Sequence, residues 1–183
     1  EPKPTFLTLW YESAEAGANA SGEYAWVYQD NTHISNFYAN KLPTLDVAMG
    51  SAYPGFNDYY QQGGGGEPIG WTIDHNNGAT LDATLAMAQS ANLKYLQLVT
   101  WNDFGEGTMF EPTVEFGYTY LDKVKAFAGV QSAPVAFAEI TKLYNLRKQY
   151  KSNSSVQAKL NKAFGYFVSM QPAKAVEVLN GIN

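Results

Sequence analysis

Four short apolar runs punctuate the first 130 residues, and each is followed by a loop rich in Gly, Asn, Asp or aromatic residues. The runs are residues 5–10, 23–28, 45–51 and 95–101. Runs of this length and composition predict strands. Continuous apolar strands joined by helical or irregular segments favour a parallel sheet, whose loops of interest follow the carboxyl ends of the strands.

Helical periodicity appears between the third and fourth runs. Residues 81–91 predict a helix with Thr80 as N-cap and Asp82 in its first turn, and the polar stretch 32–39 predicts a shorter one. The run Gly63 to Gly66 lacks the Lys and Ser or Thr of a phosphate-binding loop, which favours a mobile surface loop.

From Ala133 onward the pattern is wholly helical and predicts a helical hairpin followed by a third helix. Apolar residues recur at helical spacing, and Pro172 opens the last helix. The residues that set this spacing are Ile140, Leu143 and Leu146 in one segment and Leu160, Ala163, Phe164 and Phe167 in the next. Asn153, Ser154 or Ser155 can cap the middle helix. We interpret this region as an appendage that packs on the rest of the protein or on a partner.

The predicted organisation is therefore an α/β domain over residues 1–130 and an all-helical C-terminal appendage over residues 131–183. A complete (β/α)8 barrel takes about 250 residues and eight strands, and only four strands are predicted. Either the sheet is open or the chain is the C-terminal half of a larger domain. The extended, proline-bearing start favours the half domain.

Composition removes several classes of function. The chain has 17 acidic and 12 basic residues, a formal charge of −5 and no stripe of Lys or Arg, which argues against binding a nucleic acid backbone. The absence of cysteine excludes disulfides and thiolate chemistry. The chain contains no run of about 18 apolar residues, which is the length that would predict a membrane span. His33 and His75 sit in polar loops without a partner at metal-ligand spacing, so we predict neither a metal site nor a cofactor.

The end of the fourth run carries the strongest candidate chemistry. An apolar strand runs into Asn102 and Asp103, and Gly105 and Gly107 allow the backbone to turn so that Asp103 and Glu106 cooperate. Cleavage of a glycosidic bond needs a protonated carboxyl and a second, ionised one. The alternative is that Asp103 caps a turn and Glu106 is a solvated charge, and the spacing alone leaves both possibilities open.

Residues 99–113 resemble the signature of glycoside hydrolase families 71 and 99. The stretch reads Val-Thr-Trp-Asn-Asp-Phe-Gly-Glu-Gly-Thr-Met-Phe-Glu-Pro-Thr. It is similar to the Trp-Asn-Asp-aromatic-Gly-Glu core of family 71 in its first half, and to the family 99 pattern from Gly-Thr to Glu-Pro in its second. The segments 9–12, 24–27 and 53–56 also look like strand ends of those barrels, so the resemblance covers roughly residues 5–125.

The resemblance implies the C-terminal half of a (β/α)8 TIM barrel that hydrolyses α-linked polysaccharide, either α-glucan or α-mannan. By position, Glu106 matches the acid/base of family 99, and Asp103 matches the carboxylate that helps the substrate's 2-hydroxyl attack the anomeric carbon. Asp103 is one methylene shorter than the Glu of family 99, so the inverting route of family 71, with a carboxylate activating water, stays equally open.

Other residues at predicted strand ends are candidates for substrate binding, and each has a structural alternative. Aromatic side chains suit the apolar faces of sugars, and polar ones suit hydroxyl groups. The candidates are Trp10, Tyr11, Trp26, Tyr53 and Trp101 for stacking and Glu12, Asn102 and Glu111 for hydroxyls. The expected partner besides substrate is a missing N-terminal half or a second copy, and the expected location is extracellular, periplasmic or cell-surface. Two alternative functions remain. The protein is a noncatalytic carbohydrate-binding relative of these hydrolases, or the helical tail has an assembly role.

Overall fold

The computed structural model describes residues 4–130 and 137–182. The chain divides into two compact units, residues 1–128 and residues 129–183. Each unit has its own hydrophobic core, so each is described by itself.

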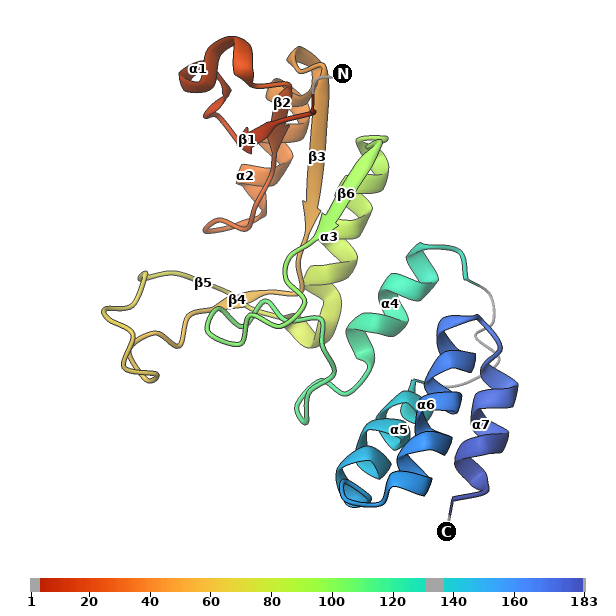
Figure 1. The fold of residues 1–183 in the computed structure, drawn as a ribbon. Helices are drawn as coiled ribbons and strands as arrows, with labels where there is room; N and C mark the ends of the chain where they lie inside the picture. Colours follow the sequence, from red (N-terminus) through yellow and green to blue (C-terminus); the bar gives the residue numbers. More distant parts are fainter. Residues whose placement is uncertain (1–3, 131–136, 183) are drawn as a thin grey trace. The chain divides into compact units, whose positions relative to one another are not determined.

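A four-stranded parallel sheet forms the framework of residues 1–128. Its strands are β1 (Leu7–Leu9), β2 (Gly22–Tyr24), β3 (Val47–Ala52) and β6 (Tyr95–Leu98), in the order β1-β2-β3-β6 (Figure 1). The predicted strands and their parallel direction are confirmed. They are shorter than the apolar runs that predict them: β1 and β3 begin two residues after the start of their runs, whereas β2 and β6 end before the carboxyl ends of theirs, which belong to loops.

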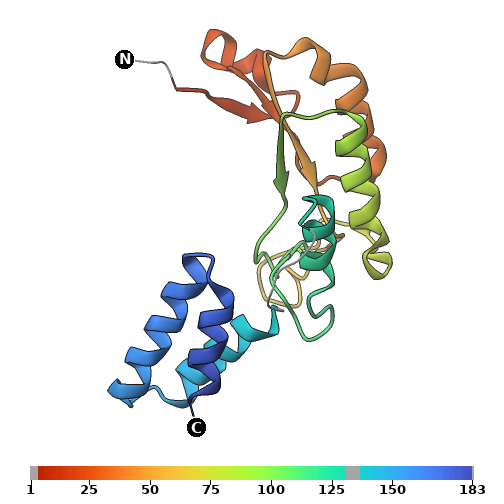
Figure 2. The same cartoon turned by 90° about the vertical axis from the view of Figure 1, so that its right-hand side faces the viewer.

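Parallel direction places the carboxyl ends of all four strands at the same end of the sheet. Two helices, α2 (Asn31–Asn36) and α3 (Ala79–Ser90), lie on one side of the strands, as Figure 2 shows. Both match predicted helices. The cap of α3 was wrongly assigned: the N-cap is Gly78, with φ 90°, whereas Thr80 lies inside the first turn and its hydroxyl donates to the carbonyl of Asp74 at 2.5 Å.

Short helical segments form the connections from β1 to β2 and from β2 to β3. A short helix α1 (Ser13–Ala16) follows β1 and continues into the 3-10 turn Gly17–Asn19. The side chain of Asp30 caps α2 by accepting from the amide of Thr32 at 2.8 Å, and α2 continues into a π-helical turn, Phe37–Lys41, and a 3-10 turn, Leu42–Thr44.

Besides the short helix α1, two further features of this unit have no counterpart among the predicted elements. The first is an antiparallel hairpin of β4 (Phe56–Asn57) and β5 (Thr72–Ile73), joined by a long loop that contains the glycine run (Figure 1). The second is α4 (Thr119–Phe127), which packs against α3. A 3-10 turn, Asn76–Gly78, leads from the hairpin into α3.

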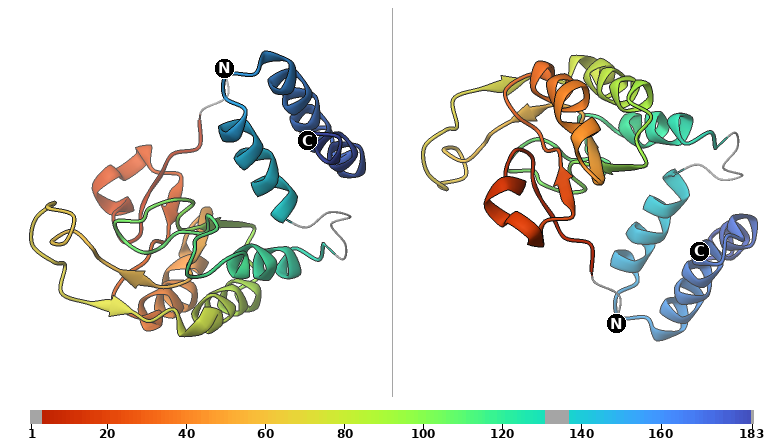
Figure 3. Two further views of the ribbon diagram at one scale, coloured as in Figure 1. Left: turned by 90° about the horizontal axis from the view of Figure 1, so that it is seen from below. Right: turned by 90° about the horizontal axis from the view of Figure 1, so that it is seen from above.

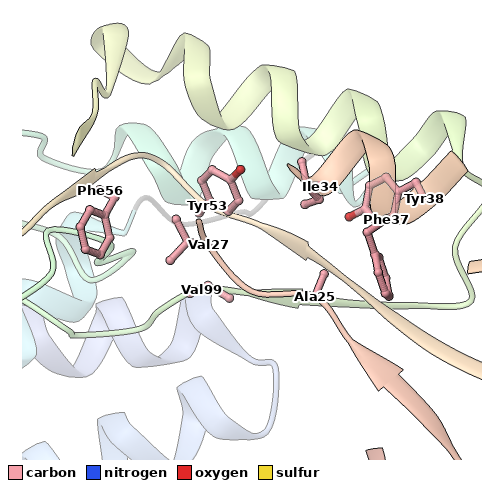
Figure 4. Packing of buried hydrophobic residues seen from close by; sticks show 8 residues of the cluster. All are labelled: Ala25, Val27, Ile34, Phe37, Tyr38, Tyr53, Phe56 and Val99. Carbon is pink, nitrogen blue, oxygen red and sulfur yellow. The ribbon is translucent and has the colours of Figure 1, made fainter. Parts of the chain in front are cut away.

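Two clusters of buried side chains hold the sheet, hairpin and helices together. The larger joins the sheet to α2 and to the start of the hairpin (Figure 4), and the smaller joins β3 to α3 and α4. The larger contains Ala25, Val27, Ile34, Phe37, Tyr38, Tyr53, Phe56 and Val99, and the smaller contains Ala52, Leu81, Leu85, Phe110 and Tyr120.

The second unit is a three-helix array of α5 (Ala138–Gln149), α6 (Ser154–Val168) and α7 (Pro172–Asn180), with α6 and α7 side by side (Figure 3). The predicted helical hairpin and third helix are confirmed, and the predicted start at residues 133–136 lies outside the described residues. Asn153 caps α6 by accepting from the amide of Val156 at 3.1 Å. Within the described ranges, no helix is long and apolar enough to cross a membrane.

Close packing behind β3 leads to a first prediction. A Cβ atom at Gly50 would lie 2.1 Å from Cδ1 of Leu93 and 2.8 Å from the Tyr38 hydroxyl. Gly50→Ala should therefore lower the free energy of unfolding of residues 1–128 by about 1–3 kcal/mol. All four tryptophans (10, 26, 71 and 101) lie in this unit, so their fluorescence in urea reports its unfolding alone.

The matched control is Gly165→Ala in α6, where an added Cβ meets nothing within 4 Å. It should leave the tryptophan transition unchanged and raise the stability of the helical unit by about 0.5–1 kcal/mol, because alanine favours a helix interior over glycine. An unchanged tryptophan transition in Gly50→Ala would show that this contact does not limit packing.

Candidate functional site

The loop after β6 is a closed, hydrogen-bonded structure that projects residues 101–107 from the end of the strand. The amide of Thr100 donates to the carbonyl of Thr108 at 2.9 Å, and the two threonine hydroxyls lie 2.9 Å apart. The amide of Phe110 donates to the carbonyl of Thr100 at 2.9 Å. Buried Val99 precedes the loop and buried Thr108 and Phe110 follow it, while its tip holds the candidate carboxyl groups.

Asp103 and Glu106 lie together in one turn at the tip of this loop. The amide of Asp103 donates to the Thr100 hydroxyl at 3.0 Å, and the amide of Glu106 donates to Oδ1 of Asp103 at 3.1 Å. Both acidic residues are half-buried. Asp103 therefore caps the turn, which is the structural role weighed in the sequence analysis, and its second oxygen, Oδ2, takes no part in that capping bond.

The β4–β5 hairpin fixes the backbone of this turn from the side. The amides of Asn57 and Tyr59 donate to the carbonyls of Glu106 and Gly105 at 2.9 and 2.8 Å. Gly107 has φ 63°, and a Cβ there would lie 3.0 Å from the carbonyl oxygen of Asn57. Only glycine allows so close an approach in this conformation.

The loop of the hairpin contributes Tyr60, which the sequence did not identify as a site residue. Its hydroxyl donates to Oε1 of Glu106 at 2.7 Å. This hydrogen bond, with a smaller effect of burial and of the charges on Glu106 and Asp103, raises the pKa of Tyr60 to about 12. Tyr60 therefore stays protonated as a donor to Glu106 at any physiological pH.

Asp58 holds the loop that carries Tyr60. Asp58 is nearly buried, and its Oδ1 accepts from the amide of Tyr60 at 3.1 Å, while Oδ2 accepts from the amide of Ile69. The glycine run forms a tight turn after Tyr60, closed by a hydrogen bond from the amide of Gly65 to the carbonyl of Tyr60 at 2.6 Å. One carboxylate therefore closes the loop at both ends.

His75 supports the site through the backbone. Its Nε2 lies 2.8 Å from the carbonyl oxygen of Gly107, and because a carbonyl only accepts, Nε2 carries the proton. The ring stacks on Phe116 and Tyr120 with centroids 4.9 and 6.1 Å away. The sequence analysis gave His75 no role, and the structure gives it a structural one.

Toward the β1 side of the sheet, Glu23 of β2 is buried and organises the loop after β1. Its carboxylate accepts from the amides of Tyr11 at 2.7 Å and Ser13 at 3.2 Å and from the Ser13 hydroxyl, and it pairs with Nζ of Lys41 at 3.1 Å. Burial alone would raise the pKa of Glu23, but these hydrogen bonds and the ammonium group together lower it. They also hold Tyr11 at φ 66°, a strained value for a bulky residue.

The candidates for substrate binding fall into three environments. In the turn loop, Trp101 exposes about half of its surface and Asn102 is exposed. Phe104, which was not among the candidates, is half-exposed beside them, and Glu111, beyond the loop, is half-buried. Tyr11 and Glu12 are also exposed but follow β1, at the opposite edge of the sheet from β6.

The remaining candidates are partly or fully covered by other side chains. Trp10 packs edge-on against Phe37, and half-buried Trp26 packs edge-on against Tyr24. Tyr53 is fully buried in the larger core cluster, with its hydroxyl donating to Asn31 at 3.1 Å (Figure 4). Its ring therefore offers no face to a sugar. Among the described residues, no group of three or more His, Cys, Asp or Glu is placed to hold a metal ion.

Comparison with known proteins identifies the fold. No protein-family model matches the chain, and no curated protein does. Two solved structures of the GH99 endo-α-mannosidase from Bacteroides thetaiotaomicron match 69% of this chain, one in complex with bis-tris-propane (20% identity, TM-score 0.53, 47% of that chain) and one without it (21%, 0.51, 44%).

This chain thus spans about half the length of the structures it matches, and at such identity the match shows a shared fold. It agrees with the resemblance to family 99 that residues 99–113 carry, so that prediction is confirmed at the level of the fold.

The environment of Glu23 predicts a pH-dependent loss of stability. Because its pKa is lowered in the folded state, Glu23 contributes stability above the pKa of the unfolded chain, near 4.5, and that contribution is lost as the pH falls through the folded value. Glu23→Gln should therefore destabilise residues 1–128 at pH 7 by about 2 kcal/mol. The deficit should shrink below pH 4. Tryptophan fluorescence in urea at several pH values measures it.

Glu15→Gln, at an exposed position in α1, removes the same charge and serves as the control. A deficit of equal size at pH 3 and pH 7 would mean that shape, rather than charge, is what Glu23 contributes.

The pKa of Tyr60 supplies a second test. Glu106→Gln replaces the charged acceptor with a neutral one, so the pKa of Tyr60 should fall from about 12 toward its ordinary value of 10. At pH 11 roughly one tenth of Tyr60 is then ionised in the parent and roughly nine tenths in a variant with the ordinary pKa. NMR of ¹³Cζ-labelled tyrosine follows the titration, with Tyr60→Phe assigning the signal. An unshifted titration in Glu106→Gln would show that this hydrogen bond is not formed in solution.

Proposed function

We propose that residues 1–128 form part of a glycoside hydrolase domain that cleaves α-linked bonds in a polysaccharide. The observation that carries the proposal is the turn in which Asp103 and Glu106 lie together, held by Tyr60 and the hairpin at the carboxyl end of a parallel strand. In (β/α) barrels this is the end of the strands that carries catalytic residues. The fold shared with the GH99 endo-α-mannosidase structures supports the reaction class.

In this proposal Glu106 is the general acid. The Tyr60 hydroxyl occupies Oε1, which orients the carboxyl group and directs Oε2 as the oxygen that carries the transferable proton. That proton passes to the glycosidic oxygen as its bond to the anomeric carbon breaks. The ionised carboxylate that results keeps the hydrogen bond from Tyr60, which is stronger to a charged acceptor, and can accept a proton from water in a later step.

Asp103 is the second carboxyl group, and two routes are compatible with its position. Oδ1 is engaged by the amide of Glu106, so Oδ2 is the oxygen that would accept a proton. The proton would come either from the substrate's 2-hydroxyl, as the oxygen of that hydroxyl attacks the anomeric carbon, or from a water molecule that attacks the anomeric carbon directly. The first route retains and the second inverts the anomeric configuration. Stereochemical analysis of the product distinguishes them.

The same loop supplies the nearest candidate contacts for sugar rings. The half-exposed rings of Trp101 and Phe104 stand on either side of Asn102 and Asp103 in the sequence, so one stretch offers both apolar faces and polar groups. Tyr11 and Glu12, at the far edge of the sheet, would serve more distant sugars.

Completion of the domain is part of the proposal. Four parallel strands are half of what a (β/α)8 barrel requires, and β1 and β6 are the outer strands of the described sheet. The other strands would come from the rest of the protein or from a second copy. A polysaccharide substrate would place the enzyme outside the cell, in the periplasm or on the cell surface.

Release of reducing sugar from α-glucans and α-mannans tests the proposal on the protein that contains this chain. Glu106→Gln should lower kcat by about a hundredfold to ten-thousandfold, because loss of a general acid has effects of that size. Binding of oligosaccharide should remain. The matched control is Glu115→Gln, which neutralises an exposed glutamate in the neighbouring segment. Equal release from parent and Glu106→Gln would remove Glu106 from the reaction. Release from neither would replace the hydrolase with a noncatalytic carbohydrate-binding protein.

A further inference from the structure

The net charge of the whole chain conceals two units of opposite sign. Residues 129–183 contain seven Lys and Arg and two Asp and Glu, a formal charge of +5. Residues 1–128 contain five and fifteen, a formal charge of −10. A charge asymmetry between two parts of a chain points to different partners for each. The helical unit is the basic one.

Three of its lysines converge on one groove between α6 and α7. Lys159, Lys162 and Tyr166 lie on one face of α6, at spacings of three and four residues, and Lys174 faces them from α7. The groove has a volume of about 570 Å³. The ammonium groups of Lys162 and Lys174 lie 5.8 and 5.7 Å from the centroid of the Tyr166 ring, so one half-buried aromatic side chain gathers both cations.

These cations lack a neutralising partner within the described part of the chain. None of the three lysines forms an ion pair there, and the ammonium group of Lys174 donates to the amide oxygen of Gln171 at 2.7 Å. Glu177 is the acidic residue that lines the groove, against three lysines. Gathering like charges around one ring is unfavourable, and a bound anion would relieve it.

We propose that this groove binds an acidic polysaccharide, with carboxylate or sulfate groups paired to Lys159, Lys162 and Lys174 and the C–H face of a sugar ring against Tyr166. A lysine ammonium pairs with such anions as a point charge, and an aromatic ring beside it covers the apolar part of a sugar. The choice of a polysaccharide over other polyanions rests on the proposed function of residues 1–128. The groove itself does not depend on that function.

The position of the apolar side chains argues against a membrane surface. The exposed residues Phe164 and Val168 follow Lys162 and Tyr166 on α6 by two positions each, which places them about 160° around the helix axis. A flat bilayer that contacts the lysines would therefore not take up these apolar side chains. Nucleic acid is disfavoured because three lysines and no arginine line the groove, too few to neutralise a long phosphate backbone.

Binding of the full chain to polygalacturonate and to dextran sulfate tests the proposal, with neutral dextran as reference. The double variant Lys162→Gln, Lys174→Gln should bind at least one of the acidic polymers about tenfold more weakly than the parent. Glu177→Gln should bind about twofold more tightly, because it removes the negative charge from the groove. Raising the salt concentration from 50 to 200 mM should weaken binding by the parent. Affinity electrophoresis or calorimetry measures these changes.

The matched control is the double variant Lys148→Gln, Lys151→Gln, which removes the same charge from the same unit outside the groove. Equal weakening in both double variants, or no binding of either acidic polymer by the parent, overturns the proposal. Equal or tighter binding to vesicles of anionic phospholipid, or to single-stranded DNA, also overturns it. Glu106→Gln should bind like the parent, so failure of the proposed hydrolase and failure of this groove give separate results.

Discussion

Two backbone hydrogen bonds, from the amides of Asn57 and Tyr59 to the carbonyls of Glu106 and Gly105, determine the arrangement of the candidate site. They join a hairpin that follows β3 to a loop that follows β6. The side chains that matter for chemistry then follow from this pairing. Tyr60, one residue beyond the second of these amides, reaches the carboxylate of Glu106 from the hairpin loop.

Much of the framework could be predicted from the sequence because it depends on local patterns. The strands around residues 7–9 and 95–98 follow from apolar runs, and the helices of the second unit follow from apolar spacing and from the cap at Asn153. α4 was missed, although Tyr120 and Val124 have helical spacing. The turn at Asp103 could be placed as well, because a strand that runs into polar residues and glycines defines its own end.

The rest depends on contacts between residues far apart in the chain. β4 and β5 have two residues each, too few to show a period, and 14 residues separate them, so their pairing leaves no local trace. The partnership of Tyr60 with Glu106 spans 46 residues. Glu23 opens an apolar run as its polar first residue, yet it is fully buried, because Ser13 donates hydrogen bonds to its carboxylate and Lys41 neutralises the charge, each from another segment.

Gly107 shows how such packing constrains evolution as well as folding. It touches the Asn57 backbone, accepts from His75 and occupies a conformation that side chains disfavour, yet it carries no reactive group. Selection at this position acts on the backbone. A survey of tolerated substitutions would score Gly107 as strictly as the neighbouring acids, and intolerance to mutation in this loop is therefore no guide to which residues meet the substrate.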